Sequence, residues 1–540
     1  FAEYDIIEGL KFKTTFGATA NSSRTGTYAP TTVTEGRNVG GDASINAYRN
    51  TLVLNENYLT YSKTFANDHT FSAMGGYSFQ SSESESYGAR GTSFITDAFS
   101  FWNLGSSAVW QAPNSALTDW QISSYYGRLN YSLGDKYLFT FNARYDGSST
   151  FSKNNKWAFF PSGAIAWNMK NEKFLETSDL ISFWKWRGSY GITGNQAISI
   201  IDGVPVNAVR PTTVANDNLT WETTAQLNIG TDIGFWDDRV TLSAEYYRMV
   251  TSDLLFAVQL PQYSGYTTQL RNIGEVENKG VELTLGSRNL VGAFQWDMDI
   301  NFSRNRNTVL SLPEGTDIQY GSGPGHMVGL GTTQLLQEGS SVGSFYGWVY
   351  DGVYQEGDEF LSGGGFEQEA GGEKFKDLNN DGVLNSDDRQ IIGNPHPDFF
   401  WGWNHDFRYK NFDLNVFFQG SVGNDILSYT LMELNLMSGI NNATTEALPR
   451  AFNGRTRRVS TRWIFDGTYT RLKNLSLGYN FPSTVVNRLG LAKLRVYVSA
   501  QNILTITSYE GYDPEVNYRS DGATDGNRNL GLDYGSYPNA

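Results

Sequence analysis

The sequence contains no cysteine. This absence excludes a disulfide-stapled scaffold, thiolate metal sites and a cysteine nucleophile. No run of about 18 apolar residues occurs, so the sequence predicts no helix that spans a bilayer. Charged residues make up only 18 %, and the formal net charge of −15 disfavours nucleic acid, whose binding proteins usually carry a basic face. There is no signal peptide, and Phe1 opens in mid-pattern, so we expect a mature or truncated piece.

Aromatic residues and glycine are abundant instead. The 540 residues include 33 Phe, 14 Trp, 31 Tyr and 57 Gly. So many large apolar side chains argue against a disordered chain. Length alone suggests one domain per roughly 150 residues, but a large barrel runs long as a single unit.

Apolar and polar residues alternate along many segments. In residues 137–145, Tyr137, Phe139 and Phe141 fall on one face, while Thr140 and Arg144 fall on the other. The same alternation recurs at 240–247, 294–303 and 494–501. Because successive side chains of a strand point to opposite faces, each segment is predicted to be a strand with one apolar and one polar face.

Two architectures could cover such apolar faces: a soluble sandwich, or an outer-membrane barrel that turns them to lipid. The barrel is favoured because the polar faces carry charge, as at Arg144, Glu282 and Asp297. Many predicted strands also reach the about 9–11 residues that a tilted crossing needs. Aromatic residues crowd the strand ends, as a membrane girdle requires.

Short and long connections alternate, as they do in outer-membrane barrels, where turns are short on the periplasmic side. Short turns are predicted at 66–68, 134–136, 236–238 and 410–411. Long polar connections are predicted at 24–45, 87–117, 196–217, 257–275, 355–397 and 424–461. About eighteen strands result. They are expected at 2–7, 10–23, 46–65, 69–86, 118–133, 137–147, 157–169, 183–195, 218–234, 239–256, 276–288, 294–310, 328–338, 343–354, 398–409, 412–423, 462–480 and 492–505.

Several strings, in a fixed order along the chain, carry a family resemblance. They include Tyr126-Gly127-Arg128-Leu129-Asn130-Tyr131, Arg144-Tyr145-Asp146-Gly147-Ser148-Ser149, Trp186-Arg187-Gly188-Ser189-Tyr190-Gly191, Asn272-Ile273-Gly274-Glu275-Val276-Glu277-Asn278-Lys279-Gly280-Val281-Glu282, Asp466-Gly467-Thr468-Tyr469-Thr470-Arg471-Leu472-Lys473-Asn474 and Asp513-Pro514-Glu515. In this order and spacing they resemble SusC/RagA-like TonB-dependent transporters of Bacteroidota outer membranes. The resemblance covers essentially the whole chain.

The resemblance implies an all-β fold, a transmembrane antiparallel β-barrel of about 22 strands around an N-terminal plug. We expect residues 1–540 to form most of this barrel, incomplete at both ends, with about three strands before Phe1 and one after Ala540. The implied partners are TonB, reached through the missing N-terminal region, a SusD-like surface lipoprotein, outer-membrane lipid, and a second copy of that pair in a dimer. The implied substrates are oligosaccharides or peptides.

One local motif predicts a metal site in the expected extracellular loop 355–397. Numbered from Asp377, oxygen-bearing side chains stand at positions 1, 3, 5, 9 and 12, with Gly382 at position 6 and the carbonyl of Val383 at position 7. This spacing is that of a twelve-residue calcium loop. The candidate ligands of a structural calcium ion are Asp377, Asn379, Asp381, Val383, Asn385 and Asp388. The alternative is an acidic turn without metal. We expect the ion to order a loop that is poor in apolar anchors.

The sequence does not favour catalysis. Gly339-Ser340-Ser341-Val342-Gly343 matches G-x-S-x-G, but its flanks are predicted to be strands, so a periplasmic hairpin turn is favoured over a nucleophile elbow. The four histidines, at positions 69, 326, 396 and 405, form no metal or triad pattern and are expected to be exposed or hydrogen-bonded.

Two further sets of residues have open interpretations. The arginines at 450, 455, 457, 458 and 462 are expected in a solvated outer loop, the alternative being contact with acidic lipid or an acidic lid. Aromatic rings at 263, 266, 348, 350, 354, 401 and 403 are candidates for stacking on sugars, although wall positions are favoured for most.

The sequence thus predicts a multi-pass bacterial outer-membrane importer for nutrient uptake, not an enzyme, with no substrate-binding residue identified. The alternatives are a passive porin-like channel, a surface adhesin or carbohydrate-binding β protein, and an enzyme embedded in a barrel.

Overall fold

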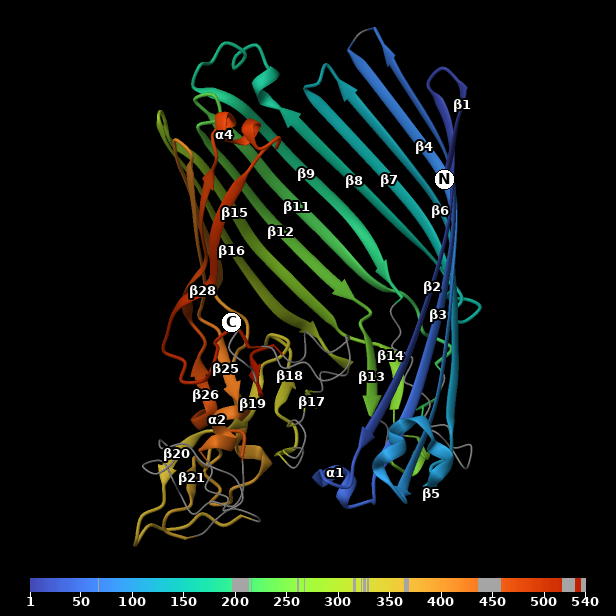
Figure 1. The fold of residues 1–540 in the computed structure, drawn as a ribbon, viewed down its shortest axis with the longest axis vertical. Helices are drawn as coiled ribbons and strands as arrows, with labels where there is room; N and C mark the ends of the chain where they lie inside the picture. Colours follow the sequence, from blue (N-terminus) through green and yellow to red (C-terminus); the bar gives the residue numbers. More distant parts are fainter. Residues whose placement is uncertain are drawn as a thin grey trace. The chain divides into compact units, whose positions relative to one another are not determined.

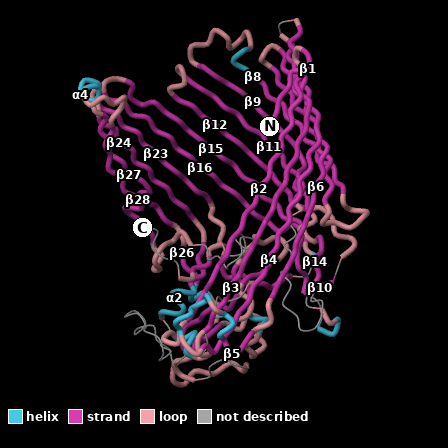
Figure 2. The backbone as a smooth tube through the Cα atoms, turned by 45° about the vertical axis from the view of Figure 1, so that its right-hand side comes forward, coloured by secondary structure: helices cyan, strands magenta, loops and turns pink. Residues whose placement is uncertain are grey.

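The structure is a computed structural model, and strands dominate it (Figure 2). It describes residues 1–535 apart from 67, 197–212, 215, 260–261, 267, 314–316, 322, 324–326, 328–329, 364–368, 436–457 and 517–529. The helices are short, as in α1 (Thr34–Arg37), α2 (Tyr429–Leu434) and α4 (Ser483–Arg488). No helix in this described part is long and apolar enough to cross a membrane.

The chain divides into two compact units. Unit 1 comprises Phe1–Ala166, Ser189–Ala225 and Thr251–Ile273, and unit 2 comprises Trp167–Gly188, Gln226–Val250 and Gly274–Ala540. Four strands contribute residues to both units, namely β8 (Trp157–Asn168), β9 (Ile181–Asn195), β11 (Glu222–Phe235) and β12 (Val240–Ser252).

Unit 1 is built on an antiparallel ladder in chain order. Its strands are β1 (Ala2–Ile7), β2 (Leu10–Ala29), β3 (Asp42–Phe65), β4 (His69–Phe94), β5 (Ser107–Trp110), β6 (Asn114–Leu133), β7 (Tyr137–Ser148) and β8 (Trp157–Asn168). β1 pairs with β2, β2 with β3, β3 with β4, β4 with both β5 and β6, and β6 with β7. β2, β3, β4 and β6 run side by side as long strands in Figure 1.

These strands are longer than the sequence predicts. β3 has 24 residues and β4 has 26, so at about 3.4 Å per residue each is about 80 Å long. A membrane crossing needs only about 9–11 residues, so more than half of each strand extends beyond the lipid. The predicted long loops at 24–45 and 87–117 are therefore wrong in large part. Their Ser, Thr, Asn and Tyr residues continue the pairing out to Asp42–Thr92 and Gly88–Asn114.

A smaller sheet and an apolar cluster complete unit 1. The sheet consists of β10 (Thr213–Val214), β14 (Thr268–Asn272) and β13 (Leu255–Gln259). The cluster contains Phe151, Phe160, Leu219 and Trp221, all buried, and the indole of Trp221 donates to the carbonyl of Lys156 at 3.0 Å. These contacts hold the connections after β7 and before β11 against the strand ends.

Unit 2 contains a second antiparallel ladder. Its strands are β15 (Glu275–Val291), β16 (Phe294–Ser311), β23 (Phe399–Tyr409), β24 (Phe412–Val422), β27 (Tyr469–Asn480) and β28 (Arg495–Thr507). Each pairs with the next in this order. At one end the β15–β16 and β23–β24 connections are short, as at Lys410, which adopts φ 52, while the β27–β28 connection at that end contains α4. The connections at the other end are long. The predicted short turns before His69, at 134–136, at 236–238 and at 410–411 are confirmed.

The long connections of unit 2 fold into a lobe, formed by the described residues within 312–398, 423–468 and 508–535. It contains three small sheets. Their strands are β17 (Ile318–Tyr320), β18 (Gln334–Leu336), β19 (Phe345–Trp348) and β22 (Arg389–Gly393); β20 (Tyr350–Val353) and β21 (Glu373–Phe375); and β25 (Asp425–Ser428), β26 (Ile464–Asp466) and β29 (Leu532–Asp533). Phe345, Leu427, Tyr429 and Met432 are fully buried at its centre.

Two of the predicted wall strands lie in the lobe instead of the wall, so their prediction is wrong. Segments 328–338 and 343–354 form only the short strands β18, β19 and β20 of the lobe, although residues 328 and 329 lie outside the described residues. Their apolar residues are buried in the lobe, which a lipid-facing strand would not require. The other sixteen of the predicted segments match strands of the two ladders and of β8, β9, β11 and β12, with longer bounds in several cases.

The alternating faces are confirmed. On β7, Tyr137, Phe139 and Phe141 are 38–50 % exposed, and on β28 Val496 and Val498 are 56 % and 75 % exposed. The polar face between them carries paired groups: Arg128 donates to Asn142 at 2.7 Å on the opposing strand. Apolar side chains that stay exposed in this regular pattern are suited to lipid contact. Leu494 lies before β28 and is half-buried.

Candidate functional site

The polar face of the ladders is a network of paired charges. In unit 2, Arg187 contacts Asp232 at 3.1 Å and Glu245 at 2.6 Å. Asp297 contacts Arg408 at 3.2 Å. Charged groups paired in this way suit a hydrated interior rather than lipid.

The histidines and the G-x-S-x-G string have structural roles. Ser341 donates to the side chain of Asn394 at 2.8 Å, while the ring of His396 bonds to the carbonyl of Val342 at 2.7 Å and not to Ser341. Burial lowers the pKa of His396. The string lies between β18 and β19 in the lobe, so the predicted periplasmic turn is wrong in its location.

Two other histidines are hydrogen-bonded, as predicted. Nδ1 of His69 lies 2.6 Å from the hydroxyl of Tyr131, and Nδ1 of His405 accepts from Trp296 at 3.1 Å. His326 lies outside the described residues.

The arginine cluster is not a solvated patch where it is described. Arg462 is 11 % exposed at its side chain and lies 3.4 Å from Glu373, and Arg458 packs over the ring of Trp348. These two arginines therefore cross-link the lobe. Positions 450, 455 and 457 lie outside the described residues. Of the predicted sugar-stacking rings, Trp348 and Tyr354 are buried, Trp401 and Trp403 belong to β23, and Tyr263 is 92 % exposed.

The calcium-loop motif forms one compact turn of the lobe, after β21. The carboxylate of Asp377 accepts from the amides of Asp381 at 3.3 Å and Gly382 at 2.8 Å. The fully buried carboxylate of Asp388 accepts from Leu378 and Asn385 at 2.8 and 2.9 Å. The carboxylates at the first and last positions of the motif thus accept hydrogen bonds from the backbone of the motif itself.

The middle positions fold inward in the same way. Asn379 donates to Asp381 at 3.0 Å, and Asp381 accepts from the amide of Val383 at 2.8 Å. Gly382 adopts φ +78, which favours glycine. Within the described ranges, no group of three or more His, Cys, Asp or Glu is arranged to hold a metal ion. An ionised carboxylate keeps further lone pairs after these bonds, so the donor set remains chemically suited to a hard cation.

The expectation that this loop lacks apolar anchors is wrong. Trp348, Phe375 and Leu384 are buried together, with Tyr350 and Leu361 packed against them. Leu384 lies inside the motif itself, so apolar packing already orders the turn.

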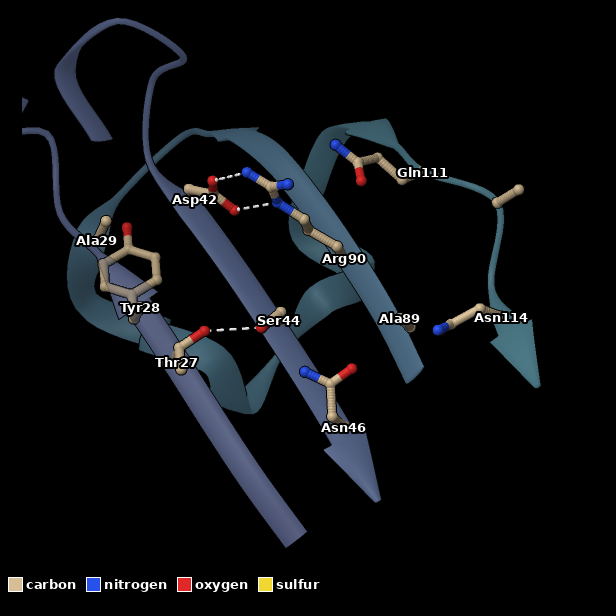
Figure 3. A pocket seen from close by; sticks show the side chains of 11 residues that line it. Thr27, Tyr28, Ala29, Asp42, Ser44, Asn46, Ala89, Arg90, Gln111 and Asn114 are labelled. Atoms are coloured by element: carbon tan, nitrogen blue, oxygen red, sulfur yellow. Dashed lines mark hydrogen bonds and ion pairs between the residues drawn. The ribbon is translucent and has the colours of Figure 1, made fainter. Parts of the chain in front are cut away.

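A cavity of about 520 Å³ lies on the part of the unit 1 strands that extends beyond the lipid (Figure 3). We call this part the outer extension. β2, β3, β4 and the segment before β6 all contribute to it. Asn114 lies on the same face of β6 as Arg128, because their positions differ by an even number, so the cavity opens on the polar face. Asp42 and Asn46 lie about 20 residues along β3 from its short turn, well beyond the lipid-facing segment.

Fixed contacts shape this cavity. Arg90 forms a two-pronged ion pair with Asp42, with Nε 2.8 Å from Oδ1. The hydrogen bonds from Arg90 lower the pKa of Asp42. Tyr28 donates to Asp97 at 2.5 Å; burial, reinforced by this contact, raises the pKa of Tyr28 to about 12. The hydroxyls of Thr27 and Ser44 lie 2.7 Å apart, as Figure 3 shows.

A glycine on β4 lies between two of the amides that line the cavity. Gly88 on β4 pairs with Asn46 on β3 and with Asn114 on β6. A Cβ at Gly88 would lie 2.3 Å from Oδ1 of Asn46 and 2.6 Å from Oδ1 of Asn114. Only glycine therefore lets the two amides close over this strand.

The sequence does not identify this cavity because its residues fall in segments predicted to be loops. One signal was present: in residues 42–47 polar Asp42, Ser44 and Asn46 alternate with Ala43, Ile45 and Ala47, which suits a paired strand. Opposing strands bring these residues together only through pairing over long sequence separations.

Comparison with known proteins assigns the fold to a family. The family model described as TonB dependent receptor-like, beta-barrel matches residues 3–382. The chain belongs to this family. The family lies in the bacterial outer membrane and consists of receptors and transporters, not enzymes.

Individual relatives agree with this assignment. TonB-dependent receptor P3 of Formosa agariphila is 49 % identical over 100 % of this chain and 56 % of its own length. TonB-dependent receptor SusC of Bacteroides thetaiotaomicron is 33 % identical over 78 % of this chain and 42 % of its own length. The chain thus spans about half the length of the curated relatives it matches.

Solved structures share the fold. The structure titled the RagAB peptide transporter matches with a TM-score of 0.79 at 23 % identity, covering 99 % of this chain and 59 % of that one. The outer membrane transporter YddB of Escherichia coli matches with a TM-score of 0.50 at 13 % identity, covering 92 % of this chain and 57 % of that one.

Proposed function

We propose that this chain is the wall of a TonB-energised importer that carries oligosaccharides or peptides across the outer membrane, together with a SusD-like surface lipoprotein. The observation that carries the proposal is the family membership, extended by 33 % identity to a protein named SusC. The polar, charge-paired face supports it, because a large hydrated substrate needs a wet interior.

The same strands would also suit a passive porin-like channel. The lobe favours the importer, because Phe345, Leu427 and Leu532, which come from three different connections, are buried in one common core. A rigid outer lobe gives a partner lipoprotein a fixed surface to bind. A surface carbohydrate-binding protein is less well supported, since it would not require two contrasting faces on each strand.

Uptake measurements in the native bacterium test this proposal. Fluorescent oligosaccharides and peptides of graded length are offered to wild-type cells, to cells lacking this gene, and to cells lacking TonB. We expect uptake of at least one probe to require both genes and to stop when an uncoupler collapses the inner-membrane proton gradient. Uptake that needs this gene but not TonB would contradict energised import and support a passive channel.

We also propose that calcium binds the turn at 377–388 and stabilises the lobe. The oxygen spacing and the closed backbone of the turn support this, and extracellular modules bind calcium at about 10⁻⁴–10⁻³ M. Asp381→Asn removes a candidate ligand charge, and Asp387→Asn removes an exposed neighbour outside the ligand set. Calcium is expected to slow proteolysis of the lobe in the wild-type protein and in D387N, but not in D381N. Equal digestion with calcium and with chelator in the wild type would refute the site.

A further inference from the structure

The cavity over Gly88 contains amide groups without a partner in the protein. Among the described residues, the side chains of Asn46, Gln111 and Asn114 have no hydrogen-bond partner, and all three line the cavity. Figure 3 shows these three side chains among the residues that line the cavity. Each carboxamide offers two N–H donors and one carbonyl acceptor. The cavity therefore presents donors and acceptors together, at fixed places on rigid strands.

The charge in the cavity is already neutralised. Asp42 occupies one edge of the Arg90 guanidinium, and the remaining N–H groups of Arg90 stay available to a neutral acceptor. Asp97 is held by Tyr28 and Thr31. An anionic ligand would meet no unpaired positive charge here, and a cationic ligand would meet no unpaired negative one.

Shape and lining narrow the ligand class further. A volume of about 520 Å³ lies within the roughly 300–1,000 Å³ typical of small-molecule sites. The aliphatic side chains of the lining are those of alanine, which offer no pocket for a large apolar peptide side chain. Tyr28 adds a flat ring, held edge-on against Phe94 at 5.8 Å. Hydroxyl groups both donate and accept, so a sugar matches this lining better than a peptide does.

We propose that this cavity is a binding subsite for a neutral oligosaccharide, which Asn46, Asn114 and Gln111 hold through its hydroxyl groups. The subsite lies on the extended strands beyond the membrane, on the polar face that leads inward. Its role in transport rests on the proposed import function, whereas its binding chemistry does not.

Two glycines on β4 provide a matched test. Gly88→Ala places a methyl group where Asn46 and Asn114 meet, whereas a Cβ at Gly75 on the same strand meets no atom within 4 Å. The double variant Asn46→Ala/Asn114→Ala removes the amides without adding bulk. Binding of maltohexaose, cellohexaose and mannohexaose to the purified full-length protein in detergent is measured by calorimetry. Hexaguluronate and hexa-alanine serve as anionic and peptide probes.

We expect at least one neutral hexasaccharide to bind the wild type and G75A equally, and to bind G88A and the double variant at least tenfold more weakly. Equal affinity in all four proteins would overturn the subsite, as would no binding of any neutral probe to the wild type. Pocket-dependent binding of hexaguluronate or hexa-alanine alone would overturn the neutral-sugar assignment.

The two proposals fail in different ways. If uptake in cells requires TonB but is unchanged in G88A and in the double variant, while binding is also unchanged, the subsite is wrong and import stands. If calorimetry shows the expected losses while the gene supports no TonB-dependent uptake, the subsite stands and the import proposal is wrong.

Discussion

Replacing Arg471 by methionine should loosen the segment that follows β28. The side chain of Arg471 is 1 % exposed, and its Nη2 donates to Asp513 at 2.7 Å while its Nη1 donates to Glu515 at 2.6 Å. Nε donates to Thr505 at 2.9 Å. Arg471 therefore links the β27–β28 hairpin to residues 513–515.

The free-energy cost of the substitution depends on the two carboxylates that lose Arg471 as a partner. Asp513 is 7 % exposed at its side chain and would lose the positive charge that faces it, keeping the neutral amide of Glu515 as a donor, whereas Glu515 would keep the charged Lys473 as well as Tyr469. Removing one partner of a buried pair costs about 3–5 kcal/mol. At about 1.4 kcal/mol per factor of ten, local opening should become roughly a hundredfold to a few thousandfold more frequent.

Limited proteolysis of the protein in detergent measures this opening. Cleavage in 508–535 should accelerate strongly in R471M, while the strands of the ladders stay protected. Arg408→Met is the matched control, because its pair with Asp297 is 56 % exposed at the arginine and should contribute only about 0–1 kcal/mol. Equal cleavage of R471M and the wild type would refute the reasoning.

Three further predictions concern the two faces of β7, the buried core of the lobe and the protonation of His396. Phe141→Arg should destabilise the protein in lipid by about 2–4 kcal/mol, because it faces lipid, whereas Thr140→Arg on the polar face should be tolerated; folding into vesicles compares them. Phe345→Ala, at 0 % exposure, should cost about 3–5 kcal/mol and lower the unfolding temperature of the lobe. Burial lowers the pKa of His396, so the neutral ring stabilises the folded state above the ordinary histidine pKa of about 6.5. This stabilisation should be lost as the pH falls from there through the lowered folded-state pKa, and His396→Gln should remove that step from thermal unfolding curves.

The wall of the protein is predictable from the sequence because its signal is local. Alternation at 137–145 depends only on which face of one strand meets lipid, and the short turns need residues such as Asp135 and Asp237 that tolerate positive φ. Both signals are read within ten residues.

The lobe and the outer extension depend on distant pairing instead. Residues 330–338 and 343–354 have the composition of strands, but Phe345 is buried together with Leu427 and Met432 in the core of the lobe instead of facing lipid. The part of the ladder beyond the membrane does not contact lipid and so needs no apolar face. Its small and polar residues are therefore predicted to be loops. The calcium-loop residues were predictable as a turn, since Asx contacts are local, but metal binding depends on oxygen positions that spacing alone does not fix.

The claim that alternate residues face lipid and a hydrated interior is tested most directly by a cysteine scan of residues 137–145. The absence of native cysteine leaves each introduced thiol as the only one in this chain. Each variant, reconstituted in vesicles, carries an environment-sensitive fluorophore, and quenching by lipid-phase and aqueous quenchers is compared. We expect positions 137, 139 and 141 to be quenched from the lipid and positions 138, 140 and 142 from the water, with a period of two residues. Quenching without this period, or water access at both sets of positions, would contradict the membrane wall and every proposal built on it.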